Sequence, residues 1–159
     1  MICSADHLSL STKDLPCTVS LQFLIRDNKL HLIVNMRSND LFMGFCYDVI
    51  IFTLWQEKML VELKEFFPEL KNGHYYHNAN SMHIYSNNYR KIKKILNDKD
   101  NNFDSELYNI PRIENVKEFD KLQLLEGKIR NNLSINDEDL SFDTDFANWI
   151  KKILLIKNI

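Results

Sequence analysis

The chain has 159 residues, 45% hydrophobic and 11% aromatic, which suits a single globular domain over residues 1–159 with a substantial core. Its formal net charge of −2 lacks the strongly basic balance that a general nucleic-acid-binding protein needs. No apolar run approaches the roughly 20 residues needed to span a bilayer. Neither nucleic acid nor a membrane is therefore expected as a partner.

Cysteine and glycine usage restricts the kinds of site that the chain can build. Cys3, Cys17 and Cys46 form an odd set without metal-ligand spacing, and no secretory segment is recognised. We therefore expect a reducing, cytoplasmic setting and no metal. The 3 glycines are too few for a phosphate-cradling Gly-rich loop or a dinucleotide fingerprint, so side chains would have to do most of any phosphate binding.

The first elements in the chain are predicted to be strands. Met1 to Ser4 suits a short strand, and residues 5–14 form a polar connection. From Thr18 to Arg26 apolar and polar residues alternate with a period of two, and the same period returns from Leu30 to Arg37. The residues between the two runs are polar and turn-forming, so we expect an antiparallel hairpin.

Helical spacing dominates the remainder of the chain. After a loop at Ser38 to Met43, a long helix is expected from Gly44 or Phe45 to about Phe67, ended by Pro68. Gly73 to Tyr85 is predicted to be extended. Three further helices are predicted, at Tyr89 to Asn97 with Ile92, Ile95 and Leu96 inward, at Val116 to Ile129, and at Asp145 to Ile156, separated by polar segments. The expected fold class is α+β, with a sheet packed on the long central helix and additional C-terminal helices.

The hairpin suggests a chemical role for one cysteine. Folding back about the turn brings Cys17, at the start of the first strand, close to Arg37, at the end of the second. A guanidinium beside a thiol favours the reactive thiolate. Each residue also has a purely structural explanation, because a lone cysteine is more often a buried apolar residue and a lone strand-end arginine a solvated charge.

Four short motifs, in a fixed order between Pro16 and Asn87, shift the balance toward function. They are Leu15-Pro16-Cys17 with Gln22 five residues after the cysteine, Arg37-Ser38-Asn39-Asp40, Gly44 with Tyr47-Asp48, and His83-Ile84-Tyr85 with Ser86-Asn87.

This ordered set resembles the thymidylate synthase family, which includes the deoxycytidylate and cytidylate hydroxymethylases. The resemblance implies a pyrimidine nucleoside monophosphate as substrate, 5,10-methylenetetrahydrofolate as one-carbon donor, and a homodimer. It implies that Cys17 is the nucleophile that activates the pyrimidine ring. The other implied roles are phosphate binding by Arg37 and Ser38, base positioning by Asp40 and Asp48, lining of the pocket by Gln22, and sugar binding by His83 and Tyr85.

Asp48 is the residue expected to determine which pyrimidine base is bound. A carboxylate in the expected first turn of the long helix is also favoured by the helix dipole alone, and that explanation stands beside a ligand role. An Asn amide complements the N3–H and O4 of uracil, whereas a protonated carboxyl offers the donor and acceptor that cytosine needs. In the family, thymidylate synthases usually carry Asn at this position and hydroxymethylases carry Asp. The resemblance therefore favours cytidylate or deoxycytidylate.

Two departures from the family leave alternatives open. The family's usual first half, with a catalytic glutamate, a tryptophan near the folate and phosphate-binding arginines, has no counterpart here, and residues 88–159 hold no recognisable closing segment. The expectation is a fragment, a shortened gene product or a protein that needs another polypeptide. Three functions remain open: a C5 one-carbon transferase, a non-catalytic nucleotide-binding or regulatory protein, and an interaction domain with family-like remnants.

Overall fold

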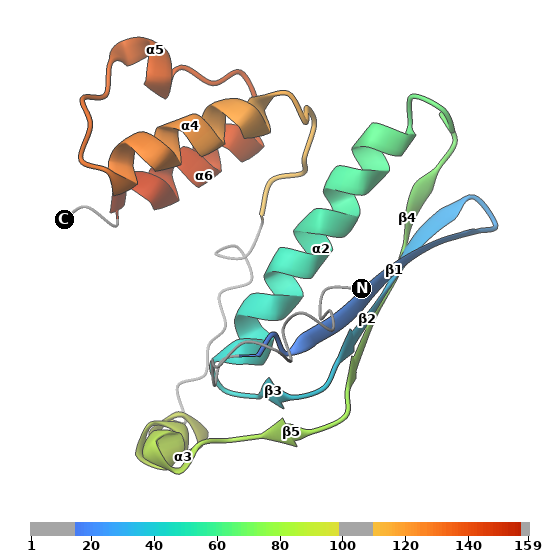
Figure 1. Cartoon of the computed structure of the whole chain (residues 1–159), viewed down its shortest axis with the longest axis vertical. Coiled ribbons are helices and arrows are strands. Elements are labelled where there is room, and N and C mark those ends of the chain that lie inside the picture. Colours follow the sequence, from blue (N-terminus) through green and yellow to red (C-terminus); the bar gives the residue numbers. More distant parts are fainter. Residues whose placement is uncertain (1–14, 99–109, 157–159) are drawn as a thin grey trace. The chain divides into compact units, whose positions relative to one another are not determined.

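The computed structural model describes residues 15–98 and 110–156, so the predicted strand at Met1 to Ser4 and most of the predicted loop after Asn97 lie outside the described residues. The chain divides into two compact units, residues 1–102 and residues 103–159 (Figure 1). The expectation of a single domain stays a prediction.

The predicted hairpin is confirmed. Strand β1 (Thr18–Arg26) pairs antiparallel with β2 (Lys29–Met36), and Arg26 lies opposite Lys29. The two turn residues, Asp27 and Asn28, have φ values of 49° and 55°. Two left-handed residues give the turn a twist that matches paired strands, and Asp and Asn are the non-glycine residues that tolerate this conformation best.

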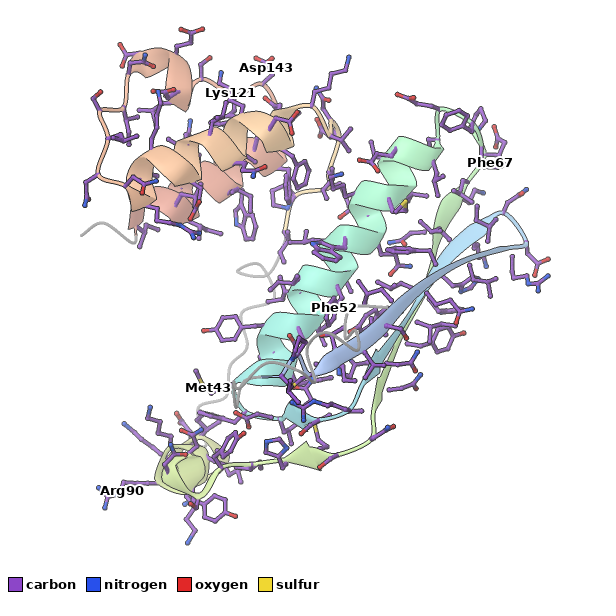
Figure 2. All side chains as sticks on the ribbon, in the orientation of Figure 1. Met43, Phe52, Phe67, Arg90, Lys121 and Asp143 are labelled. Carbon is purple, nitrogen blue, oxygen red and sulfur yellow. The ribbon has the colours of Figure 1, made fainter. Side chains whose placement is uncertain are left out.

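A long helix covers one face of a three-stranded sheet. Helix α2 (Gly44–Leu63) connects β2 to β4 (Lys71–Ala79), which pairs parallel with β2 and gives the order β1-β2-β4 (Figure 1). Phe52 of α2 packs on alternate residues of β2 (Figure 2), and Leu60 packs farther along the sheet. The buried residues of this core are Leu30, Leu32, Val34, Met36, Phe52, Leu60 and Leu70.

The end of the long helix differs from the sequence expectation. Helix α2 ends at Leu63, four residues before the predicted end, because the amides of Phe66 and Phe67 turn back onto the Leu63 carbonyl. The residue before a proline is disfavoured in the helical region, so Pro68 acts on the chain before its own position.

The predicted loop and extended segment also contain a pairing that the sequence did not indicate. The segment predicted as extended is split after β4, and its second part, β5 (Met82–His83), pairs parallel with β3 (Asn39–Asp40) inside the predicted loop. Two-residue strands carry no periodicity, so only the tertiary pairing defines them.

The 3-10 turn η1 (Ser86–Asn88) leads into helix α3 (Tyr89–Asn97), which has the predicted bounds. The predicted inward orientation of Ile95 and Leu96 is wrong, since these side chains are 52% and 76% exposed within the described part of the chain. Spacing identifies an apolar stripe on a helix, but it does not say whether another element covers that stripe.

The second unit is helical. Helices α4 (Glu118–Arg130) and α6 (Asp145–Ile156) lie close to their predicted positions, and the short α5 (Asp137–Leu140) stands in the segment predicted only as polar. A reciprocal capping box between Asn136 and Asp139 forms this extra turn. The core of this unit contains Leu122, Leu125, Phe142 and Ala147.

A carboxylate joins the helices of the second unit. Glu118 at the start of α4 accepts hydrogen bonds from the backbone amides of Asp143 (2.8 Å) and Thr144 (3.3 Å), and from the Thr144 hydroxyl. Partial burial raises the pKa of Glu118, but these hydrogen bonds and the charge of Lys121 outweigh it, so the pKa lies below its ordinary value. Glu118 therefore caps the chain entering α6.

Candidate functional site

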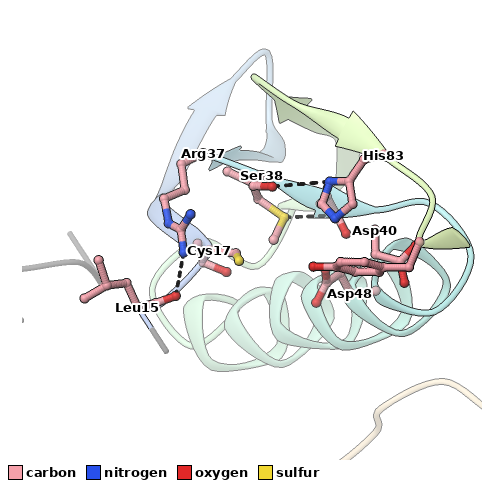
Figure 3. Close-up of a pocket in the computed structure, with 12 residues that line it drawn as sticks. Leu15, Cys17, Arg37, Ser38, Asp40, Asp48 and His83 are labelled. Atoms are coloured by element: carbon pink, nitrogen blue, oxygen red, sulfur yellow. Dashed lines mark hydrogen bonds between the residues drawn. The ribbon is translucent and has the colours of Figure 1, made fainter. Parts of the chain in front are cut away.

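A cavity of about 510 Å³ lies where the start of β1, the end of β2, β3, the first turns of α2 and β5 meet (Figure 3). Residues from all four sequence motifs line it together. The lining residues are Leu15, Cys17, Thr18, Met36, Arg37, Ser38, Asn39, Asp40, Gly44, Asp48, His83 and Tyr85.

The hairpin brings Cys17 and Arg37 together, as its pairing predicted. The amide of Arg37 donates to the carbonyl of Cys17 at 2.9 Å, and the cysteine is free and exposed. The guanidinium of Arg37 donates through Nη2 to the carbonyl of Leu15 (2.8 Å) and through Nε to that of Pro16 (3.2 Å), as Figure 3 shows for Leu15. Arg37 thus fixes the chain that leads into the cysteine.

A β-bulge aims the first residues of β1. The register shifts between Thr18 and Ser20, so that Thr18 lies opposite Met36 while Ser20 lies opposite Asn35. One extra residue in a strand reverses which face the following side chains occupy. Thr18 consequently lies on the same face of the sheet as Met36 and lines the cavity. Without the bulge, simple alternation would place Thr18 and Leu21 on different faces.

Asp40 contributes backbone geometry more than a free carboxylate. Its two carboxylate oxygens accept from the amides of Phe42 (3.1 Å) and Met43 (3.3 Å), which shapes the entry to α2. The pairing of β3 with β5 uses the amides of Asn39 and Leu41, each at 2.8 Å from its acceptor. Strand alternation directs the Asp40 N–H away from β5.

His83 and Tyr85 lie on one side of the cavity, as expected for residues two positions apart in an extended segment. Their ring centroids are 4.8 Å apart in an edge-to-face arrangement. The Ser38 hydroxyl lies 3.4 Å from His83 Nδ1 (Figure 3), so three of the predicted site residues form one polar group.

Asp48 lies in the second turn of α2, because the helix begins at Gly44 and its first turn holds no acidic residue. The predicted first-turn position is therefore wrong, and the helix dipole does not account for this carboxylate. Burial first and the charge of Asp48 second raise the pKa of Tyr75 to about 12. The carboxylate faces the cavity and the polar residues beneath it.

Gln22 is the predicted site residue that the structure does not bring to the cavity. It is exposed in the middle of β1, opposite Ile33, while its neighbours Leu21 and Phe23 pack on the core. The expectation that Gln22 lines this cavity is not met. The position of a residue along a strand decides which face its side chain occupies and how far it lies from the cavity, whereas the spacing of a motif decides neither.

Two residues that sequence reasoning overlooked support the cavity from below. Asn39 is 4% exposed and its Nδ2 lies 2.9 Å from Nε2 of His77, whose Nδ1 lies 2.5 Å from the Tyr75 hydroxyl. His77 belongs to the segment that the sequence predicts only as extended. Its parity with Tyr75 and Ala79, both packed against the core, was the signal that could have revealed its inward orientation.

The sequence was compared with known proteins. The family model described as "Thymidylate synthase" matches residues 3–134. The deoxycytidylate 5-hydroxymethyltransferase of Enterobacteria phage T6 is 37% identical over 90 residues, which covers 53% of this chain and 35% of that protein. The thymidylate synthase of Mycoplasma genitalium is 33% identical over 78 residues, or 49% of this chain and 25% of that protein.

A deoxyuridylate hydroxymethyltransferase of Bacillus phage SP01 is also similar, at 34% identity over 84 residues, covering 53% of this chain and 21% of that protein. The match spans only about a third of the length of the phage deoxycytidylate relatives.

Among the residues that the structure describes, no helix has both the length and the apolar character needed to cross a bilayer.

Proposed function

This chain belongs to the thymidylate synthase family, and from that premise we propose that it binds a pyrimidine nucleoside monophosphate and activates C5 of the base for one-carbon transfer. The convergence of residues from four separate motifs around one cavity carries the proposal. The second support is the similarity to proteins named deoxycytidylate 5-hydroxymethyltransferase, deoxyuridylate hydroxymethyltransferase and thymidylate synthase.

Cys17 is the proposed nucleophile. Its thiolate adds to C6 of the pyrimidine, and the electron pair of the C5–C6 double bond moves toward C5 and the substituent at C4. C5 then carries enolate or enamine character and can take up an electrophile or a proton. When the cysteine leaves from C6, C5 loses its original proton and the double bond returns. The exposure of Cys17 at the cavity wall fits this role.

The remaining lining residues suit the rest of a nucleotide. We propose that Arg37 and Ser38 bind the phosphate, since a guanidinium fork matches phosphate oxygens and a hydroxyl donates beside it. His83 and Tyr85 would contact the sugar, and the Asp40 N–H would donate to the base. Asp48, protonated or sharing a proton with N3, would complement cytosine, so cytidylate or deoxycytidylate is the proposed substrate.

The family generally uses 5,10-methylenetetrahydrofolate as its one-carbon donor. Tyr85 is the only phenol or phenyl ring among the lining residues of the described cavity, so this lining holds no pair of flat apolar surfaces for a pterin ring. The cavity residues fit a nucleotide and not the folate. We assign no residue of this cavity to the folate.

A second function has support in one observation. Arg37 is the only arginine or lysine that lines the described cavity, and two of its N–H groups already bind main-chain carbonyls. One guanidinium that already holds two carbonyls neutralises only part of the charge of a phosphate dianion. A catalytically incomplete family member that binds nucleotide in a regulatory or interaction role is therefore the alternative.

Exchange of the hydrogen at C5 separates the two functions without the folate. Addition of a thiolate at C6 makes C5 basic, so tritium at C5 of deoxycytidylate should pass into water in the presence of the chain. Cys17→Ser should abolish this release and still bind nucleotide, while Cys46→Ser, the matched exposed cysteine, should keep it. Binding without exchange would support the regulatory alternative, and absence of nucleotide binding would contradict both.

We further propose that the chain forms a homodimer. Helix α2 covers one face of the β1-β2-β4 sheet, and the opposite face carries partly buried Leu24 and Ile33 within the described residues. A sheet with apolar residues on both faces gains stability when a second layer covers it. Sedimentation that finds only monomer at micromolar concentration would contradict this proposal.

A further inference from the structure

The side chain of Asn39 is buried beneath the cavity with a fixed orientation. Its Nδ2 lies 3.2 Å from the sulfur of Met36 and 2.9 Å from Nε2 of His77. A thioether can only accept a hydrogen bond, so the amide atom that faces it must be the NH2 group. Both amide hydrogens therefore have acceptors, and the amide oxygen is left for another partner.

The same geometry fixes the tautomer of His77. Since Nε2 accepts from Asn39, the ring proton resides on Nδ1, which lies 2.5 Å from the Tyr75 hydroxyl oxygen and donates to it. Burial lowers the pKa of His77, against an opposing effect of Asp48, so the ring is neutral. The rings of Phe45 and Phe52 flank His77 at centroid distances of 5.0 and 6.5 Å. Tyr75, His77 and Asn39 form a chain of hydrogen bonds that ends at the cavity.

The free end of this chain meets Asp48. A Cβ atom placed on Gly44 would lie 2.6 Å from Oδ1 of Asn39 and 3.7 Å from Oδ2 of Asp48. The two oxygens thus approach one point at the start of α2, and glycine leaves that point open. Both atoms accept hydrogen bonds, and Gly44, Asn39 and Asp48 all line the cavity.

We propose that Asn39 Oδ1 and Asp48 together receive the two hydrogens of an exocyclic amino group, and that His77 and Tyr75 are positioning residues that hold the Asn39 amide in this orientation. The inference rests on the proposed function and identifies a second determinant of base choice. The amino group at C4 of cytosine donates two hydrogens to two acceptors. The O4 of uracil would meet the same two acceptors with no hydrogen between them.

Binding constants for deoxycytidylate and deoxyuridylate, measured by titration calorimetry on the 159-residue chain, test the proposal. Asn39→Ala should lower the preference for deoxycytidylate roughly tenfold, as expected for an unpaired polar group. His77→Leu should lower it too, because the amide is then free to turn. His77→Gln should restore the preference, since its side-chain oxygen can accept from Asn39. His74→Gln, on the exposed face of the same strand, is the control and should change nothing.

A second measurement needs no variant. Nitrogen-15 NMR of the histidine side chains should show His77 as the neutral tautomer with its proton on Nδ1. The opposite tautomer would overturn the proposal.

The outcomes separate this inference from the proposed function. An unchanged preference in both Asn39→Ala and His77→Leu, beside a changed preference in Asp48→Asn, would overturn the role of Asn39 and leave the proposed function standing. A wild-type chain that binds neither nucleotide would overturn both.

Discussion

Two carboxylates, one in each compact unit, occupy opposite kinds of surroundings. Glu118 in the helical unit accepts from two backbone amides and a hydroxyl, and its pKa is lowered. Asp48 in the sheet unit receives no hydrogen bond or ion pair from the described residues; its neighbours include the amide oxygen of Asn39. A carboxylate whose acceptors are filled by the chain stabilises the fold, whereas one without internal donors is available to a ligand.

Asp48→Asn should have the largest effect of these substitutions on nucleotide binding, and it tests whether Asp48 serves a ligand and not the fold. The amide reverses the donor and acceptor pattern, so the preference for deoxycytidylate over deoxyuridylate should fall or invert by roughly tenfold to a hundredfold. The free energy of unfolding should change little, because the carboxylate has no internal partner among the described residues. Calorimetric titration of both monophosphates measures the ratio. A wild type that prefers deoxyuridylate, or a mutant with the same preference, would contradict the assignment.

Substitution of two glycines sharpens the contrast between the units. Gly44→Ala places a Cβ 2.6 Å from Asn39 Oδ1, so nucleotide binding should weaken by roughly tenfold as the amide is displaced. Gly127→Ala in α4 meets nothing within 4 Å and should stabilise its helix by about 0.5–1 kcal/mol. Titration with nucleotide and denaturant unfolding of both variants provide the measurements. Equal effects of the two substitutions on binding would show that Gly44 has no special place at the site.

Glu118→Gln tests the structural carboxylate. The amide can still accept hydrogen bonds but loses the charge, so we expect a loss of about 1 kcal/mol or less in the stability of the helical unit. Denaturant unfolding in a Trp55→Phe background, in which Trp149 of α6 is the remaining tryptophan of the chain, measures it. Nucleotide binding should stay at the wild-type value, and a change there would show that the two carboxylates are not independent.

The pH dependence of stability should carry the smallest effect. The folded-state pKa of Glu118 is lowered, so the unfolded chain binds more protons between the two pKa values and stability rises with pH there. The contribution is complete above the unfolded value of about 4.3 and is lost as pH falls through the lower folded value. Unfolding midpoints of wild type and Glu118→Gln should therefore converge as the solution becomes more acidic. A constant difference over this range would contradict the role given to Glu118.

Much of the sheet unit followed from local sequence rules. The period of two in β1 and β2 and the Asp27-Asn28 turn fixed the hairpin, and the hairpin alone placed Cys17 next to Arg37. The similarity of the motifs to a known family then predicted a common site for residues from distant parts of the chain. Such predictions succeed where pattern and pairing partner are neighbours in sequence.

The features that sequence missed depend on contacts between distant residues. The pairing of β3 with β5 joins segments some forty residues apart, and the bulge before Ser20 changes the face that Thr18 occupies relative to the rest of β1. Gln22 matched a motif but lies on an exposed strand position. Asn39, which had no assigned role within its motif, and His77, which belongs to no motif, lie beneath the cavity. These roles depend on the burial of each side chain and on the distances between side chains. The spacing of residues along the sequence predicts neither quantity.

The position of Arg37 relates the phosphate end of the proposed nucleotide to the cysteine that would react with its base. A guanidinium has five N–H donors in one rigid plane, and two of them hold the carbonyls of Leu15 and Pro16 just before Cys17. In the proposed nucleotide complex, the phosphate binds the remaining donors of the guanidinium, while the same rigid group holds the main chain next to the sulfur. One planar group would then set the separation between phosphate and thiol. A nucleotide of the wrong length would present its ring out of step with the sulfur even if its phosphate were fully bound.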